Sequence, residues 1–311
     1  MKGLRVHSSR RMVFSLSLLI VSLAALTTLP LSNAQTLNWA TVTSPTNHGL
    51  SSVSCVSSND CWAVGSSGTI VQWSGSSWAT VTSPTSSTLE GVFCVSSSDC
   101  WAVGWSGTII QWNGVSWATV TSPVSGYTTL SSVFCVSSSD CWAVGGATIQ
   151  WSGSSWATVT SPSSGLSSVF CVSSSDCWAV GSSGTIVQWN GSSWVSVTSP
   201  TGNALDSVSC ASSNDCWAVG ENPNGAAPMV QWSGSSWATI ANPTFFDLYS
   251  VFCVNSSDCW GVGISGKIIQ ISGSSWVPVT SPTGNDLYSV SCASSNDCWA
   301  VGDSGTIVQG T

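Results

Sequence analysis

The chain has 311 residues, only 6% of them charged, and its 13 acidic residues outnumber its five basic ones. Four of the five basic residues lie within the first 11 positions, so the remainder keeps a single lysine, Lys267, and no arginine. Such a surface cannot neutralise phosphate groups, which excludes nucleic acid and anionic lipid as partners.

The first 34 residues have the pattern of a secretory signal peptide. A basic start is followed by an apolar stretch over residues 12–29 and by the small residues Ser32, Asn33 and Ala34. We therefore predict that residues 1–34 are removed before Gln35, and that the protein is secreted or held at the cell surface. The alternative is an uncleaved membrane anchor, but serine and threonine residues dilute the apolar stretch.

The rest of the chain is an internal repeat. Each unit contains the motif L-x-S-V-x-C-x-S-S-x-D-C-W-A-V-G, and successive units are 36 to 43 residues apart. In the second unit, four short runs rich in β-branched and aromatic residues cover Leu89–Val95, Cys100–Gly104, Thr108–Trp112 and Trp117–Ser122. Runs of this length between turn residues are typical of strands. Four strands in each of seven units predict an all-β, seven-bladed propeller with four-stranded antiparallel blades.

The two ends of the repeat predict that the ring is closed. The last unit stops at residues 308–311 and lacks its fourth strand, whereas Trp39–Pro45 is a fourth strand with no unit before it. We expect this N-terminal strand to complete the last blade beside Thr306–Gln309, which removes exposed sheet edges. Residues 35–311 are then a single propeller domain, and we expect it to be a monomeric ring.

The stretch Asp60–Val81, "DCWAVGSSGTIVQWSGSSWATV", resembles the repeat of the BNR, or Asp-box, propellers. It is especially similar to the photosystem II assembly and stability factor-like group, whose repeats are of the WD/YVTN/BNR type. The resemblance covers nearly all of residues 37–311 and implies the propeller fold. Two departures matter for function: Ser74-Gly75 and its equivalents replace the aspartate of the Asp-box turn, and the arginine cluster of a sialidase is absent.

Fourteen cysteines form seven pairs with C-x5-C spacing. In an exported chain this spacing predicts seven disulfides, each joining the first two strands of a blade. Zinc is the alternative, but its sites use tighter spacing and further ligands, and His48 is the only histidine outside the signal peptide. We therefore expect no metal and no cofactor. The predicted pairs are Cys55–Cys61, Cys94–Cys100, Cys135–Cys141, Cys171–Cys177, Cys210–Cys216, Cys253–Cys259 and Cys292–Cys298.

Two other residue types recur in every unit and are interpreted as structural. An aspartate precedes each second cysteine, and we expect it to accept backbone N–H bonds at the turn rather than to act in catalysis or metal binding. Nineteen of the 20 tryptophans occupy repeat positions, where we expect them to pack blade against blade. Trp105 is the exception.

Function is expected on the face of the ring that does not repeat. Turns between strands one and two and between strands three and four share one uniform face. The remaining connections share the other face and differ between blades; they hold Asp206, Asp286, Asp303 and an insertion at residues 221–228. The candidate binding residues there are Glu90, Trp105, Tyr127, Glu221, Asn222, Asn224, Phe245, Phe246, Asp247, Tyr249 and Tyr288.

Three functions fit these residues. The first is a non-catalytic binding scaffold that holds an extracellular protein or glycan through the loop aromatics. The second is a polysaccharide hydrolase or lyase that uses a pair of loop carboxylates, such as Glu90 and Glu221. Against an enzyme, one histidine and one lysine leave little other acid–base chemistry. The third is a structural protein of the cell surface or matrix.

Overall fold

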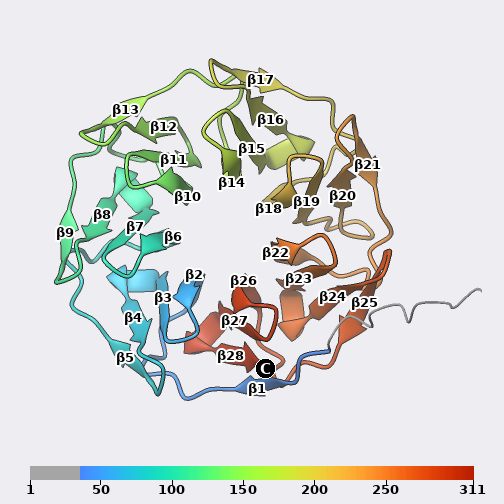
Figure 1. The fold of residues 1–311 in the computed structure, drawn as a ribbon, viewed down its shortest axis with the longest axis horizontal. Coiled ribbons are helices and arrows are strands. Elements are labelled where there is room, and N and C mark those ends of the chain that lie inside the picture. The colour runs from blue at the N-terminus through green and yellow to red at the C-terminus, as the bar shows by residue number, and fades with distance from the viewer. Residues whose placement is uncertain (1–35) are drawn as a thin grey trace, which may run out of the picture. The chain divides into compact units, whose positions relative to one another are not determined.

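The computed structural model describes residues 36–311, which form seven four-stranded antiparallel sheets arranged as the blades of a propeller (Figure 1). The predicted signal peptide lies outside the described residues. In six of the sheets the strands follow chain order from the centre of the ring outward, and in the seventh the outermost strand comes from the N-terminal end of the chain. The strand that opens each repeat unit therefore faces the central axis. The predicted all-β, seven-bladed fold is confirmed.

The first and second strands carry the recurring cysteines. The first strands are β2 (Leu50–Ser57), β6 (Leu89–Ser96), β10 (Leu130–Ser137), β14 (Leu166–Ser173), β18 (Leu205–Ser212), β22 (Leu248–Asn255) and β26 (Leu287–Ser294). The second strands are β3 (Asp60–Gly65), β7 (Asp99–Gly104), β11 (Asp140–Gly145), β15 (Asp176–Gly181), β19 (Asp215–Gly220), β23 (Asp258–Gly263) and β27 (Asp297–Gly302). We number the blades from 1, which begins with β2, to 7, which begins with β26.

The outer strands are shorter. The third strands are β4 (Ile70–Trp73), β8 (Ile109–Trp112), β12 (Thr148–Trp151), β16 (Ile186–Trp189), β20 (Met229–Trp232), β24 (Ile268–Ser272) and β28 (Ile307–Gly310). The fourth strands are β5 (Trp78–Thr80), β9 (Trp117–Thr119), β13 (Trp156–Thr158), β17 (Trp194–Ser196), β21 (Trp237–Thr239), β25 (Ser275–Val279) and, for blade 7, β1 (Trp39–Thr41).

Single 3₁₀ turns join the second and third strands in five blades. They are η1 (Ser66–Gly68), η2 (Trp105–Gly107), η3 (Ser182–Gly184), η4 (Ile264–Gly266) and η5 (Asp303–Gly305). Among the described residues, no helix has both the length and the apolar character needed to cross a membrane.

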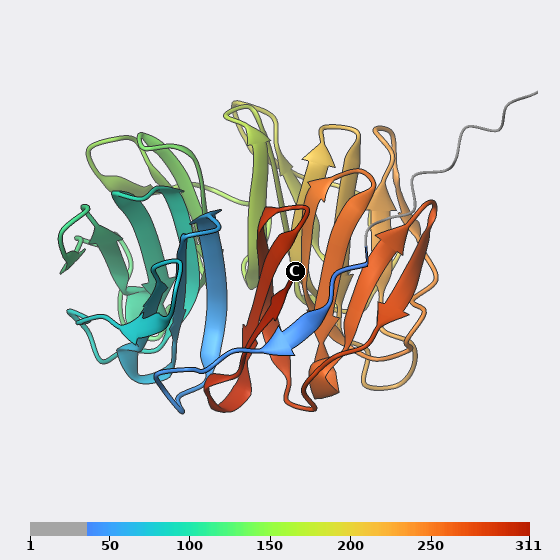
Figure 2. The same cartoon turned by 60° about the horizontal axis from the view of Figure 1, so that its bottom comes forward.

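The ring closes through β1, as the two ends of the repeat predict. Trp39 of β1 pairs with Gly310 of β28, and Thr41 pairs with Val308, so the first and last strands lie side by side (Figure 2). A Cβ atom on Gly310 would come within 2.8 Å of the Trp39 ring, which explains the glycine at this position. The Trp39 ring lies 5.4 Å from that of Trp260 in blade 6, so closure also buries an aromatic contact.

Tryptophans pack neighbouring blades together, as expected. Trp62 of blade 1 is fully buried, with its ring 4.8 Å from Trp112 and 5.3 Å from Trp117 of blade 2. The equivalent tryptophans repeat this contact around the ring, for example Trp101 with Trp156 at 5.3 Å. Because each blade buries its aromatic side chains against the next, the apolar core is a series of seven clusters that lie between the sheets.

All seven predicted disulfides are present, and no cysteine in residues 36–311 is free. Each joins residues that lie directly opposite each other in the first two strands, as Cys94 and Cys100 do with Cα atoms 3.9 Å apart. The sulfur atoms therefore staple the hairpin that faces the axis of the ring.

The recurring aspartate is structural, but its partner differs from the prediction. The Asp99 carboxylate accepts a hydrogen bond from the Gln111 side-chain amide at 3.0 Å, and the same pair forms in six blades. In blade 6, Asp258 accepts a hydrogen bond from the Trp260 indole at 2.9 Å. We expected backbone N–H donors. Since Gln111 lies opposite Trp101, two residues beyond Asp99 on the same face, the glutamine side chain reaches the carboxylate diagonally across the strands.

Candidate functional site

The two faces of the ring differ in the way that the sequence predicts. The constant face consists of the turns after each first and third strand, and it repeats the same contacts. For example, the Trp112 indole donates to the carbonyl of Ser97 in the adjacent turn at 3.1 Å, and five blades share this bond. The variable face consists of the turns after each second strand and the loops between blades. It carries the residues that break the repeat.

Exposed aromatic side chains gather on the variable face. Tyr127 is fully exposed, and Phe245, Trp105 and Phe246 are 73%, 54% and 48% exposed. All other exposed large hydrophobic residues in the described part of the chain are valines. An aromatic ring left in water is unfavourable for the isolated molecule, so this face has the composition of a binding surface.

Trp105 and Glu90 form a pair at the inner edge of blade 2. Trp105 begins η2, and its indole N–H donates to the Glu90 carboxylate at the start of β6. Blade 7 places a second pair at the equivalent positions, where the Tyr288 hydroxyl donates to the Asp303 carboxylate at 3.1 Å. Both pairs hold an aromatic ring beside an acid next to the mouth of the central axis.

Phe245 and Phe246 lie on the loop between β21 and β22. The buried side chain of Asn242 holds this loop: its amide donates to the carbonyl of Phe246 at 3.0 Å, and its oxygen accepts the Thr244 N–H at 2.9 Å. Phe245 has a positive φ of 60°, which is unusual for a bulky residue. The ammonium group of Lys267 lies 4.5 Å from the centre of the Phe246 ring.

The insertion at residues 221–228 packs against the same loop. The backbone N–H of Asn222 donates to the Asp247 carboxylate at 2.9 Å. The side chain of Asn222 donates to Ala226 O and accepts the backbone N–H of Asn224, so this asparagine holds the insertion in shape. The structure therefore gives Asn222 a role in positioning, while Glu221 adds a charge.

Negative charge is concentrated on blades 5 to 7. Burial, reinforced by the nearby carboxylates of Glu221 and Asp247, raises the pKa of Asp206 to about 7. Burial, reinforced by Asp286 and other acids nearby, raises the pKa of Tyr249 to about 12. We call the acidic residues of this side the acidic arc; they are Asp206, Glu221, Asp247, Asp286 and Asp303.

The first strands surround an axial channel, whose mouth on the variable face is polar. The register of β6 with β7 shifts after Leu89, so that Glu90 and Gly91 both line this mouth, and the same shift occurs in every blade. The resulting pocket has a volume of about 170 Å³. The residues that follow the strand-opening leucine line it: Ser51, Glu90, Ser131, Ser167, Asp206, Tyr249 and Tyr288.

Three of the predicted binding residues thus meet in one pocket, namely Glu90, Tyr249 and Tyr288. The pocket adds Asp206, which lies on the predicted face but is not among the candidate residues. Glu221 and Asp247 lie close enough to act on Asp206 electrostatically. The loops carry the other candidates at the surface, and Tyr127 projects from the loop between β9 and β10.

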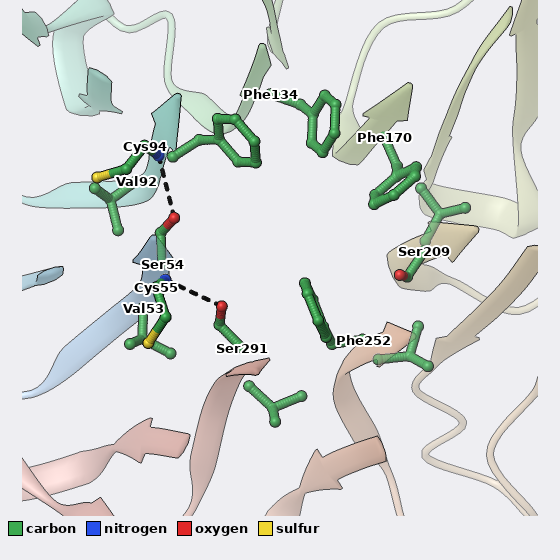
Figure 3. Close-up of a pocket in the computed structure, with 14 residues that line it drawn as sticks. Val53, Ser54, Cys55, Val92, Cys94, Phe134, Phe170, Ser209, Phe252 and Ser291 are labelled. Atoms are coloured by element: carbon green, nitrogen blue, oxygen red, sulfur yellow. Dashed lines mark hydrogen bonds between the residues drawn. The ribbon is translucent and has the colours of Figure 1, made fainter. Parts of the chain in front are cut away.

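Further along the channel, towards the constant face, lies a second hollow of about 350 Å³, which the sequence did not predict (Figure 3). Phe134, Phe170 and Phe252 point into it. They occupy the x of V-x-C, where other blades have serine. The signal in the sequence is this alternation between serine and phenylalanine inside an otherwise uniform strand.

No group of three or more histidine, cysteine, aspartate or glutamate side chains in residues 36–311 is arranged to hold a metal ion. The acids of the constant face are bound to glutamine or tryptophan, and those of the variable face are spread over several loops. What the variable face offers chemically is aromatic surface, negative charge and a polar pocket.

Comparison with known proteins gives the fold. No family model matches the chain, and no curated protein matches it by sequence. Among solved structures it is similar to YCF48 bound to D1 peptide, with a TM-score of 0.73 and 15% identity over 89% of this chain and 98% of that one. Streptogramin B lyase has a TM-score of 0.77 and 12% identity over 89% of this chain and 98% of that one. The WD40 propeller domain of Doa1 has a TM-score of 0.70 and 14% identity over 89% of this chain and 96% of that one. At these identities the likeness shows the fold alone.

Proposed function

We propose that the protein is a non-catalytic binding scaffold that holds an extracellular protein or glycan on its variable face. One observation carries this proposal: the exposed aromatic side chains, Trp105, Tyr127, Phe245 and Phe246, all lie on that face. Rigid aromatic rings held in place by a scaffold are the usual anchors of binding surfaces. The acidic arc beside Phe245 and Phe246 favours a partner that carries positive charge or hydrogen-bond donors.

The proposal includes export. Residues 1–34 act as a signal peptide, and the propeller of residues 35–311 works outside the cytoplasm. Seven disulfides support this, because structural disulfides persist in oxidising compartments. We also propose that the repeat is a degenerate Asp-box repeat, close to that of the photosystem II assembly and stability factor-like group. The shared fold with YCF48 supports this relationship.

A protein or peptide is the favoured partner. In the solved complex, YCF48 is bound to D1 peptide, so a propeller of this shape can present a peptide-binding surface. The present chain has no arginine outside the predicted signal peptide, and its binding face is acidic, so the favoured ligand is not an acidic one.

The test is capture of partners from the medium and surface of the producing cell, with variants that borrow residues from other blades. Trp105→Ser gives η2 the serine that stands in η1 and η3. Phe245→Gly with Phe246→Asn gives this loop the Gly284-Asn285 sequence of the loop before β26. Both changes remove aromatic surface and use residues that the fold already accepts at these positions.

The matched control is Val115→Ser. Val115 is 84% exposed on the constant face, and other blades have serine at its position. We expect capture of one defined partner to fall at least tenfold in the two variable-face variants and to be unchanged in the control. Equal capture by all variants would contradict the proposal, and ordered self-assembly without any partner would favour a structural protein.

One observation favours a second candidate, a polysaccharide hydrolase or lyase. Glu90 and Asp206 line the same polar pocket, and burial together with the nearby acids Glu221 and Asp247 raises the pKa of Asp206 to about 7. Glycoside cleavage requires two carboxyl groups in different protonation states, and a raised pKa suits the one that acts as the acid. Turnover of a polysaccharide that disappears in both Glu90→Gln and Asp206→Asn would establish this candidate in place of the scaffold.

A further inference from the structure

The axial channel has two levels with opposite chemistry. The first strands run from the variable face towards the constant face, so the residue after each leucine lies near the polar mouth and the x of V-x-C lies deeper. All seven blades line both levels, and Val92 borders both hollows. Three residues of strand separate the levels, which corresponds to roughly 10 Å.

The deeper level is more apolar than the fold requires, because some blades have serine and others phenylalanine at the same position. In three blades its lining residue is serine, and this serine has a structural role. The Ser54 hydroxyl accepts the Cys94 N–H at 3.1 Å, and the Ser291 hydroxyl accepts the Cys55 N–H at 3.2 Å (Figure 3). The other four blades have phenylalanine there, which cannot accept such a bond. They are Phe93, Phe134, Phe170 and Phe252.

These phenylalanines form a half-buried aromatic wall. The Phe134 ring lies 4.4 Å from that of Phe93 and 4.5 Å from that of Phe170, and Phe252 stands on the opposite side of the hollow. The hollow of about 350 Å³ is large enough for a small organic ligand. In four blades, therefore, a phenylalanine replaces the serine that bonds to the next blade, and its apolar ring lines the hollow.

The residues of the polar level favour a ligand with a positive charge. Its only ionisable carboxyl groups are Glu90 and Asp206, which project from blades 2 and 5. Tyr249 and Tyr288 add aromatic rings, whose centres are 5.5 Å apart. Neither level contains a basic residue, because the single lysine outside the signal peptide lies beside Phe246 on the loops. Carboxylates and aromatic rings together are the groups that bind organic cations.

We propose that the axial channel is a second binding site, which takes a small amphipathic cation with its apolar part among Phe134, Phe170 and Phe252 and its cationic group between Glu90 and Asp206. The apolar half of this site is separate from the proposed partner surface, because the phenylalanines lie in the channel and not on the loops. The polar half adjoins that surface, since Asp206 belongs to the acidic arc and Glu90 is bonded to Trp105. Its ligand class is a quaternary ammonium or amine that carries an alkyl or aryl group.

The experiment is calorimetric titration of residues 35–311 with octyltrimethylammonium, octanol and octanoate, all below their micelle-forming concentrations. These three probes share the alkyl chain and differ in charge. We expect the cation to bind at least tenfold more tightly than octanol, and octanoate to bind most weakly. Equal affinity for the three probes, or a preference for octanoate, would overturn the proposal.

Two sets of variants locate the binding. Phe134→Ser with Phe170→Ser introduces the residue that three blades have at this position, so the ring should fold. It should weaken both the cation and octanol at least tenfold. Asp206→Ser introduces the serine of blades 1, 3 and 4, and should weaken the cation about tenfold while leaving octanol unchanged. Unchanged cation binding in the phenylalanine variant would mean adsorption elsewhere and would overturn the site.

The two proposals fail separately. The phenylalanine variant should capture the extracellular partner as well as the parent protein does. The variable-face variant Phe245→Gly with Phe246→Asn should bind octyltrimethylammonium as the parent protein does. Loss of both activities in either variant would show that channel and loops form one site, and would overturn the second site.

Discussion

The acidic residues of the constant face and those of the variable face have opposite surroundings. On the constant face each aspartate lies beside a hydrogen-bond donor from a neighbouring residue of its own blade, as Asp99 does with Gln111 at 3.0 Å. On the variable face, Asp206, Glu221 and Asp247 lie near one another, and burial together with this mutual repulsion raises the pKa of Asp206 to about 7. A carboxylate thus stabilises the blade on the constant face, whereas on the variable face the close carboxylates repel one another.

The contrast between the two faces separates structural from functional residues in a repeat protein. A residue that occurs once per blade must satisfy a need of every blade, such as closing a hairpin or filling the space between sheets. A residue that breaks the repeat is free of that need, and here such residues leave aromatic rings in solvent and bring acids close to one another. Scaffold residues and candidate-site residues should therefore respond differently to substitution.

The largest effect is expected from loss of the closing strand. Deletion of residues 35–45 removes β1 and the buried Trp39, and it exposes the edge of β28. We expect a loss of at least about 5 kcal/mol, which lowers Tm by roughly 10–20 °C in a chain of this length. The control deletes residues 222–225 from the variable-face insertion and should melt within a few degrees of the parent protein. Calorimetry measures the Tm of both deletion variants. Equal Tm values would contradict the view that the closing strand stabilises the ring and that the variable-face insertion does not.

Two tryptophans of blade 2 give the next largest contrast. Trp101 is fully buried against Trp156 of blade 3, whereas Trp105 is 54% exposed. Trp101→Ala should cost about 3–5 kcal/mol of unfolding free energy, and Trp105→Ala less than about 1 kcal/mol. Partner capture should show the reverse order, with a loss only in Trp105→Ala at temperatures where both variants are folded. Equal destabilisation in urea titrations would contradict the assignment of the two roles.

A single disulfide should matter less than a buried tryptophan. Replacement of Cys94 and Cys100 by alanine opens a loop of seven residues and should cost about 2.4 kcal/mol through the entropy of the unfolded chain. Tm should fall by roughly 5–10 °C, while partner binding at 25 °C stays the same because the staple lies away from the variable face. Weaker binding in the folded double variant would show that scaffold and site are coupled.

The smallest effect depends on pH. Because the fold raises the pKa of Asp206 to about 7, the folded state binds this proton more tightly than the unfolded chain does. Stability therefore falls as pH rises from about 4 to about 7, where the folded state loses the proton. Asp206→Ser should add roughly 1 kcal/mol at pH 8, after allowance for solvent screening, and almost nothing at pH 4.5. An equal gain at both pH values in urea titrations would refute the charge effect.

Much of the fold could be predicted because the same motif occurs seven times in the chain. Cys94 and Cys100 with their six counterparts fix the hairpins, and the unpaired strand at Trp39 predicts closure. The partner of each recurring aspartate was predicted wrongly. Asp99 and Gln111 are 12 residues apart, and only the register of β7 with β8 brings them together.

The candidate site was predictable as a face but not as a set of contacts. The loops that hold Trp105 and Phe245 differ visibly from their counterparts, so their positions mark the variable face. That Glu90 and Asp206 share a pocket could not be predicted, because two blades separate them and they come to one pocket only when the ring closes around its axis.

The strands of a blade, its disulfide and the side chains that pack it follow from the repeat motif, since these contacts form within a unit or between successive units. The axial channel, in contrast, depends on how all seven blades are arranged in space. Closure brings the first strands of all seven blades around one axis, and small differences in their lining then add up to a polar mouth and an aromatic interior. The bulge after each leucine adds to this, because it breaks the simple alternation from which inward-facing residues are predicted.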